Sequence, residues 1–250
     1  MIMFNFDTIV EPRMFGVFHL FWLLIMGIAI ILTIKLTKDG RHRKKFLLVV
    51  GIYLLISEIY KQFFYYQLHQ TYYWNFLPFQ LCSIPMYLAL ISGFCRNLKI
   101  VDTCDKFIAY YGLLGGVIVM IYPEVALGNY MVMNIHSMIW HILLVVMGIY
   151  LIKVHQFGNN YLKELVPPTL IFGISVIIAE IINISLYDYL KTINQTINLF
   201  AISPKLPISA SFIEVIFGSS SIYLYICLYL VAILIGVSLI FLINNKILKR

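Results

Sequence analysis

The sequence predicts an all-α fold, a polytopic membrane helix bundle with about seven transmembrane helices. Hydrophobic residues make up 62% of the 250 positions and charged residues only 12%, against about 25% charged in an average soluble domain. Apolar runs of the length that a spanning helix needs, about 20 residues, recur along almost the whole sequence. Residues 1–250 are therefore expected to form one integral membrane domain of a multi-pass protein in the cell membrane.

The seven expected helices follow the apolar runs in order. The first run comes after Asp7 and Glu11 and lacks the basic start of a signal peptide, so we expect it to be retained as a helix. The fourth run is the shortest, and its Gly112, Gly115 and Gly116 suit close packing against a neighbouring helix. The expected spans are Phe15–Leu36, Phe46–Tyr66, Leu77–Phe94, Phe107–Tyr122, Met131–Ile152, Pro168–Leu190 and Ile222–Ile243.

The connections between these helices predict their orientation. Most basic residues of the connections fall on one side of the membrane, and only Arg13, Lys191 and Lys205 fall on the other. Because basic residues favour the cytoplasmic side, the N-terminus is expected outside and the C-terminus in the cytoplasm. The same rule explains the net charge of +7 without a nucleic-acid partner. In the longest connection, residues 191–221, we expect a short interfacial helix or lid over residues 208–218.

Polar residues inside the expected spans mark a candidate site, because an ionisable group at membrane depth costs several kcal/mol. At about 1.5 Å per residue they fall in the outer half of the bundle, which predicts one polar chamber there and an almost wholly apolar inner half. A purely structural role for each residue is the alternative. Glu58 and Lys61, three apart on one helix face, are expected to pair. The chamber comprises Cys82 and His141 with His19, Glu58, Lys61, Gln80, Asn134, His136, Ser137 and Glu180.

Cys82 is the candidate nucleophile. Pro78 suits the first turn of the third helix, which would place Cys82 near free backbone N–H groups that favour a thiolate. A histidine on a neighbouring helix can then serve as the general base. His136 and His141 are five positions apart and cannot both face Cys82, whereas Ser137 and His141 share a helix face. The alternative for Cys82 is a small buried hydrophobe. The cysteine spacings predict neither a metal site nor a disulfide framework.

Several motifs together resemble those of the YwaF family of bacterial integral membrane proteins. That family is similar to the TMEM-type phospholipid acyltransferase and, more remotely, to the androgen-induced and ADTRP-type membrane hydrolases. The resemblance implies a nucleophile at Cys82 and a base at His141, and His136 falls where relatives can carry glutamine, which argues against it as the base. The motifs are Met14-Phe15, His19-Leu20, Ser57-Glu58, Trp74, Leu77-Pro78-Phe79-Gln80-Leu81-Cys82-Ser83-Ile84, Pro123-Glu124, His141 and the segment 198–214.

The resulting hypothesis is a membrane-embedded acyl-transfer enzyme that acts on lipid esters. Cys82 attacks the acyl carbonyl, His141 relays the proton, and Gln80, Asn134 or backbone N–H groups near Pro78 stabilise the oxyanion. Membrane lipids are the expected substrates, and no metal or organic cofactor is required. The rival hypothesis is a non-enzymatic binder or transporter of a lipid or small solute that uses the same polar chamber. A third is a structural partner whose polar layer only holds helices together.

Overall fold

The computed structural model describes residues 12–155, 157–206 and 222–245, and these ranges are helical apart from their connections. Six of the described helical segments are long and apolar enough to cross a membrane, which confirms the predicted fold class. The expected lid over residues 208–218 lies outside the described residues. The helices are α1 (Val17–Leu36), α2 (Arg43–His69), α3 (Ile84–Phe94), α4 (Leu98–Phe107), α5 (Leu113–Ile121), α6 (Met131–His155), α7 (Tyr161–Thr192) and α9 (Ile222–Ile243).

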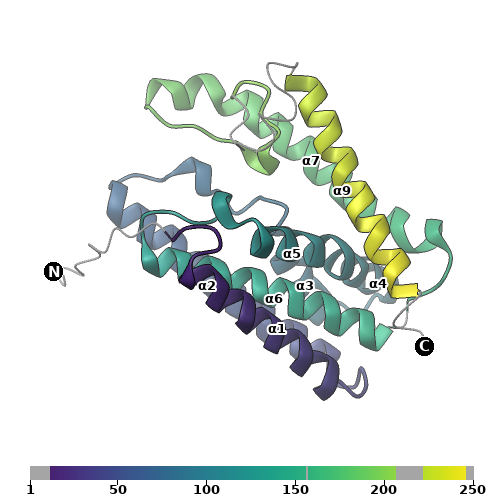
Figure 1. The fold of residues 1–250 in the computed structure, drawn as a ribbon. Coiled ribbons are helices and arrows are strands. Elements are labelled where there is room, and N and C mark those ends of the chain that lie inside the picture. The colour runs from purple at the N-terminus through teal and green to yellow at the C-terminus, as the bar shows by residue number, and fades with distance from the viewer. Residues whose placement is uncertain (1–11, 156, 207–221, 246–250) are drawn as a thin grey trace.

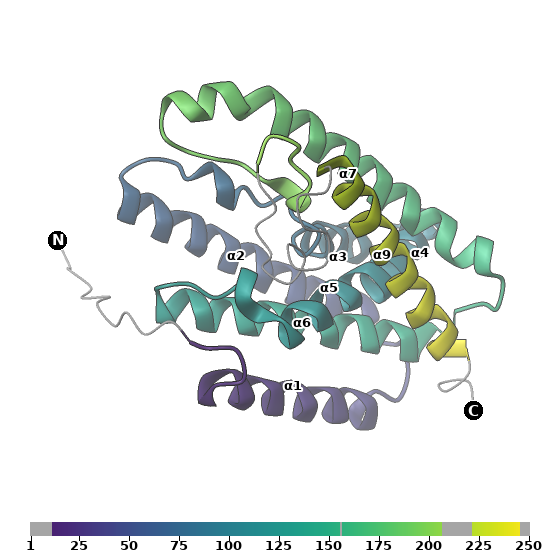
Figure 2. The same ribbon diagram turned by 45° about the horizontal axis from the view of Figure 1, so that its top comes forward.

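The segment formed by α4 and α5 lies at the centre of the bundle. Figures 1 and 2 both place α3, α4 and α5 between a group formed by α1, α2 and α6 and the pair formed by α7 and α9. Most of the α4–α5 segment is buried, whereas His19 is the one buried residue of α1. The exposed side chains of α1 are largely apolar, as expected for a helix that faces lipid.

The third helix is shorter than predicted. It begins at Ile84 instead of Leu77, and Pro85, not Pro78, lies in its first turn, the position where the missing proline N–H costs no hydrogen bond. Its 11 residues extend only about 16 Å at 1.5 Å per residue, less than the bilayer core of about 30 Å. The preceding residues 77–83 are not helical and include turns and bends. Such backbone is tolerated at membrane depth when protein covers it.

The fourth helix begins earlier than predicted, at Leu98 instead of Phe107. The Asn97 side chain caps it by accepting hydrogen bonds from the N–H groups of Lys99, at 3.0 Å, and Ile100, at 3.4 Å. The helix then runs to Ile121 through a π-helical turn over Ile108–Gly112. The capping asparagine and the lack of any breaker before Phe107 explain why the polar residues of α4 are helical instead of forming a connection.

The helix α7 also begins earlier than predicted, at Tyr161 instead of Pro168, and therefore contains Pro167 and Pro168. A proline at position 167 cannot donate the helical hydrogen bond to the carbonyl of Lys163. Lys106 Nζ donates to that carbonyl instead, at 3.3 Å. Neighbouring helices commonly satisfy carbonyls that proline frees within membrane helices. The last span, α9, has the predicted bounds.

Gly116 allows α5 to approach α6 closely, as the predicted packing role of its glycines requires. A Cβ atom at this position would lie 2.8 Å from the carbonyl oxygen of His141 and 2.9 Å from a methyl group of Val145. A backbone oxygen cannot move as a flexible side chain can, so any larger residue here must separate the two helices. Small residues at such crossings are typical of membrane bundles.

Gly116→Ala is therefore expected to destabilise the protein by about 1–3 kcal/mol, the usual cost of overpacking a core. Gly27→Ala is the matched control, because Gly27 also lies within a helix but has open space around it. Alanine has a higher helix propensity than glycine, so the control variant is expected to be slightly more stable than the wild type. Unfolding of both variants in mixed detergent micelles measures the difference, and equal stabilities would contradict the close approach.

Candidate functional site

Three polar side chains of α2 form a connected group within the bundle. Glu58 is almost fully buried and pairs with Lys61, Nζ to Oε2 at 2.9 Å, which confirms the predicted pair. Its other oxygen accepts a hydrogen bond from Gln62 Nε2 at 2.7 Å. Gln62 Nε2 also donates to the carbonyl of Phe76, at 2.6 Å, in a short 3-10 helix (Trp74–Phe76) of the α2–α3 connection. The Glu58 charge is therefore balanced, and its side chain is held in one position.

His136 is the α6 residue of the predicted chamber that contacts α2, and His141 binds within α6. His136 Nε2 lies 3.2 Å from the carbonyl of Ser57 on α2. His141 Nδ1 lies 2.7 Å from the carbonyl of Ser137, one turn earlier on α6, and 3.4 Å from the hydroxyl of the same serine. A carbonyl oxygen only accepts, so His141 Nδ1 carries the hydrogen in this contact. The other ring nitrogen of a neutral imidazole is then a free acceptor.

That nitrogen, His141 Nε2, is buried and has no hydrogen-bond partner among the described residues. Buried polar atoms in folded proteins are nearly always paired, so each exception needs an explanation. A nitrogen that accepts a proton from a substrate or a nucleophile is one such explanation. The orphan atom distinguishes His141 from the other predicted histidines.

Cys82 lies just before α3, directly ahead of Ser83, the residue that precedes the first helical turn. The prediction that Cys82 would lie inside the third helix is therefore wrong, although the residue remains next to that helix start. The indole N–H of Trp140 donates to the Cys82 carbonyl at 3.0 Å, and Trp140 precedes His141 on α6. Within the described residues, no hydrogen bond joins the Cys82 thiol to the His141 ring.

Gln80 binds residues 198–200, in the connection that follows α7, to the turn that contains Cys82. Its Oε1 accepts from the N–H of Phe200 at 2.6 Å, and its Nε2 donates to the carbonyl of Asn198 at 3.3 Å. The backbone of the neighbouring Leu199 binds the side chain of Asn183 on α7. The Leu199 N–H donates to Asn183 Oδ1 at 2.8 Å, and Asn183 Nδ2 donates to the Leu199 carbonyl at 3.1 Å. Phe200 has a left-handed backbone, with φ 57°, which is uncommon for a large side chain. These contacts fix the connection beside Cys82.

Two other predicted chamber residues, His19 and Asn134, have structural partners elsewhere. His19 Nδ1 accepts from the N–H of Phe15 at 2.9 Å, and its Nε2 donates to the carbonyl of Met120 at 2.8 Å, which joins α1 to α5. The Asn134 amide makes two 2.8 Å bonds with the N–H and the carbonyl of Gly128. Glu180, on α7, has one buried carboxylate oxygen without a partner among the described residues. The chamber thus divides into a central group around α2, α6 and Cys82 and several separate contacts.

A buried charged cluster at the opposite, basic end of the bundle was not predicted. Asp105 on α4 is fully buried and pairs with Arg43 at the start of α2 and with His155 at the end of α6. Arg43 also donates to the buried Ser92 hydroxyl at 2.8 Å. One sequence signal could have indicated it. No glycine or proline lies between Asp105 and the glycine-rich run that begins at Gly112, which is typical of a helix that continues.

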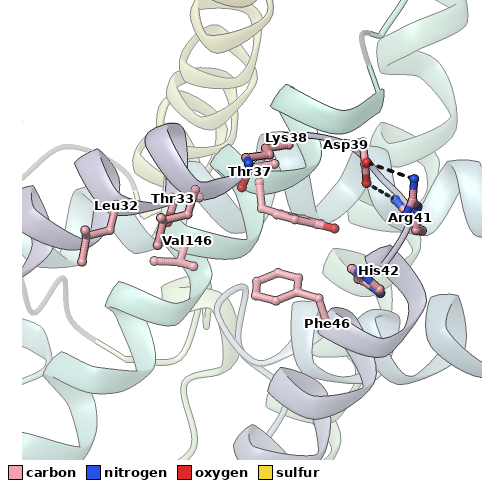
Figure 3. Close-up of a pocket in the computed structure, with 11 residues that line it drawn as sticks. Leu32, Thr33, Thr37, Lys38, Asp39, Arg41, His42, Phe46 and Val146 are labelled. Carbon is pink, nitrogen blue, oxygen red and sulfur yellow. Dashed lines mark hydrogen bonds and ion pairs between the residues drawn. The ribbon is translucent and has the colours of Figure 1, made fainter.

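A pocket of about 460 Å³ also lies at this basic end, among α1, the α1–α2 connection, α2 and α6 (Figure 3). None of its lining residues belongs to the predicted chamber. The pocket and the group around Cys82 are therefore separate features of the bundle.

The sequence of the chain matches that of a known protein family. The family model described as "TMEM164 family" matches residues 14–243. The chain belongs to the TMEM164 family. No curated protein and no solved structure matches it. Membership of the TMEM164 family agrees with a multi-pass membrane protein, whereas the kinship to YwaF proteins and to acyltransferases stays a prediction.

Proposed function

We propose that the chain is a membrane-embedded enzyme that transfers acyl groups from lipid esters by means of Cys82 and His141. The observation that carries the proposal is the His141 ring, in which Nδ1 binds the Ser137 carbonyl while the buried Nε2 has no partner among the described residues. This arrangement presents the lone pair of a neutral imidazole inside the protein. A general base requires that protonation state and that lack of a competing donor.

The position of Cys82 supports its pairing with this base. Trp140, which precedes His141 on α6, donates a hydrogen bond to the Cys82 carbonyl. This bond attaches the turn that contains Cys82 to the part of α6 that carries His141. Glu58 and Lys61 neutralise each other, so neither offers a free charge as a competing base. The thiol and the ring have to approach each other when the substrate binds, and catalytic contacts often tighten only in that complex.

The reaction has two balanced steps. The Cys82 sulfur attacks the acyl carbonyl while its proton moves to His141 Nε2; the ester C–O bond then breaks, and the proton passes to the departing lysolipid oxygen. In the second step His141 takes the proton of a lysophospholipid hydroxyl or of water, whose oxygen attacks the thioester. The new C–O bond forms, the C–S bond breaks, and the proton returns to sulfur.

The groups that the sequence suggested for stabilising the oxyanion largely have other hydrogen-bond partners, which a substrate would have to displace. The amide groups of Gln80 and Asn134, which the sequence also suggested, already bind the backbone of residues 198–200 and of Gly128. Using either amide would first break those bonds. The first N–H groups of α3 are also in use: Ser83 and Ile84 donate to the Gln80 carbonyl, at 2.8 Å and 3.2 Å, and Met86 donates to the Ser83 carbonyl at 3.1 Å. Pro85, in the first turn, has no N–H.

The rival function, a non-enzymatic binder or transporter, is favoured by one observation. The buried oxygen of Glu180 has no partner among the described residues, as a carboxylate that receives a solute or a proton would require. On this hypothesis, Glu180→Gln abolishes uptake or binding while Cys82→Ala leaves it intact. The acyl-transfer proposal predicts that Cys82→Ala abolishes acyl exchange and that Glu180→Gln leaves it intact.

Cys82→Ala tests the proposed function directly. We expect the variant to lose acyl exchange between a labelled phospholipid and a lysophospholipid in proteoliposomes, by at least about 10³-fold, because the covalent step is removed. A labelled acyl chain should also remain attached to the wild-type protein through a hydroxylamine-sensitive thioester bond. Cys227→Ala is the matched control, since Cys227 is an exposed cysteine on α9. Full exchange by a folded Cys82→Ala variant would refute the mechanism.

A further inference from the structure

The pocket at the basic end has two chemically different sides. Its charged side is formed by Lys38, Asp39, Arg41 and His42, which Figure 3 shows around the α1–α2 connection. Its apolar side is formed by Leu32, Leu36 and Val146. The rings of Phe46 and Tyr150, whose centroids are 4.3 Å apart, also line the pocket.

The charged side carries a net positive charge that no described partner fully balances. Lys38 has no acidic partner among the described ion pairs, and Asp39 lies 4.0 Å from Arg41, with both side chains highly exposed. An exposed pair at that distance is weak. The pocket also includes the residue before α2, His42, where no side chain caps the helix start. Helix starts favour negative charge, so both features select an anion.

The apolar side continues into the surface that faces lipid. Leu32 and Leu36 are 49% and 73% exposed on α1, a helix that is apolar enough to span the membrane. The pocket lies where α1 ends and α2 begins, at the level of one membrane interface. An occupant can therefore place an anionic group among Lys38, Arg41 and His42 while a hydrocarbon chain follows α1 into the bilayer. A soluble anion would leave the apolar side unused.

We propose that this pocket binds the phosphate-bearing headgroup of an anionic phospholipid, with an acyl chain along α1. Its volume, about 460 Å³, lies within the usual range for ligand sites, about 300–1,000 Å³. Basic pockets between membrane helices are known sites for anionic lipid headgroups. The site is separate from Cys82 and His141, so the proposal does not depend on the acyl-transfer function.

Binding of dioctanoyl phosphatidylglycerol to the full-length protein in a neutral detergent, followed by native mass spectrometry, tests the proposal. We expect at least tenfold weaker binding of dioctanoyl phosphatidylcholine. The double variant Lys38→Gln/Arg41→Gln should bind phosphatidylglycerol about 30-fold more weakly, because each basic residue near an anionic lipid contributes about fivefold. Inorganic phosphate at the same concentration should not displace the lipid.

The matched control is Lys35→Gln/Lys45→Gln, which removes the same charge from exposed positions that do not line the pocket. We expect its affinity to change by less than about threefold. Val146→Phe keeps every charge and fills the apolar side, and it should also weaken binding. Equal loss in the two double variants, displacement by inorganic phosphate, or unchanged binding by Val146→Phe would each overturn the proposal. If the first double variant fails to fold, Val146→Phe decides the question.

Discussion

His141→Ala is expected to lower acyl exchange by about 10²–10⁴-fold, the range over which a positioned general base contributes to a reaction. The reason is that His141 Nε2 is a buried ring nitrogen without a partner among the described residues, and its Nδ1 is held by the Ser137 carbonyl. Removal of the ring removes the acceptor for the Cys82 proton in the first step and for the proton of the lysophospholipid hydroxyl or of water in the second. The measurement is the initial rate of exchange between a labelled phospholipid and a lysophospholipid in proteoliposomes.

His136→Ala is the control for this variant. It removes a histidine from the same helix whose Nε2 already contacts the Ser57 carbonyl at 3.2 Å, so its effect on the rate should be much smaller. Thermal unfolding of both variants separates loss of chemistry from loss of fold. A rate loss in His136→Ala as large as that in His141→Ala would contradict the assigned base.

Asp105→Ala is expected to destabilise the protein by about 3–5 kcal/mol, the usual cost of removing one partner from a buried ion pair. Asp105 is fully buried and accepts from Arg43, Ser92 and His155, which come from three other parts of the bundle. Without the carboxylate, the Arg43 charge stays largely buried and has no acidic partner within the described residues. Unfolding in mixed detergent micelles measures the change.

Asp39→Ala provides the comparison, because its partner Arg41 lies 4.0 Å away and both side chains are highly exposed. Pairs of that kind contribute about 1 kcal/mol or less. The Asp105→Ala variant should therefore unfold well before Asp39→Ala, and similar stabilities would show that the buried cluster contributes little. Asp105→Asn should fall between them, since it keeps the side-chain shape and loses the charge.

The sequence alone determined where most helices lie and which short-range pairs they make. The bilayer sets the length of an apolar run, so α1 and α9 were predicted nearly to the residue. The pairing of Glu58 with Lys61 followed from helical spacing, and the packing role of Gly116 followed from its lack of a side chain. Each of these properties depends on residues that are close in the sequence or on the surrounding lipid.

Only the tertiary structure decided which polar residues act together. Asp105 looked like part of a connection until its partners on α2 and α6 showed that it is buried. His19 and His141 are both buried histidines in apolar helices, yet both ring nitrogens of His19 have partners, whereas Nε2 of His141 has none among the described residues. Neither difference is visible in a local pattern, because the partner of a buried polar atom is chosen by packing between distant segments.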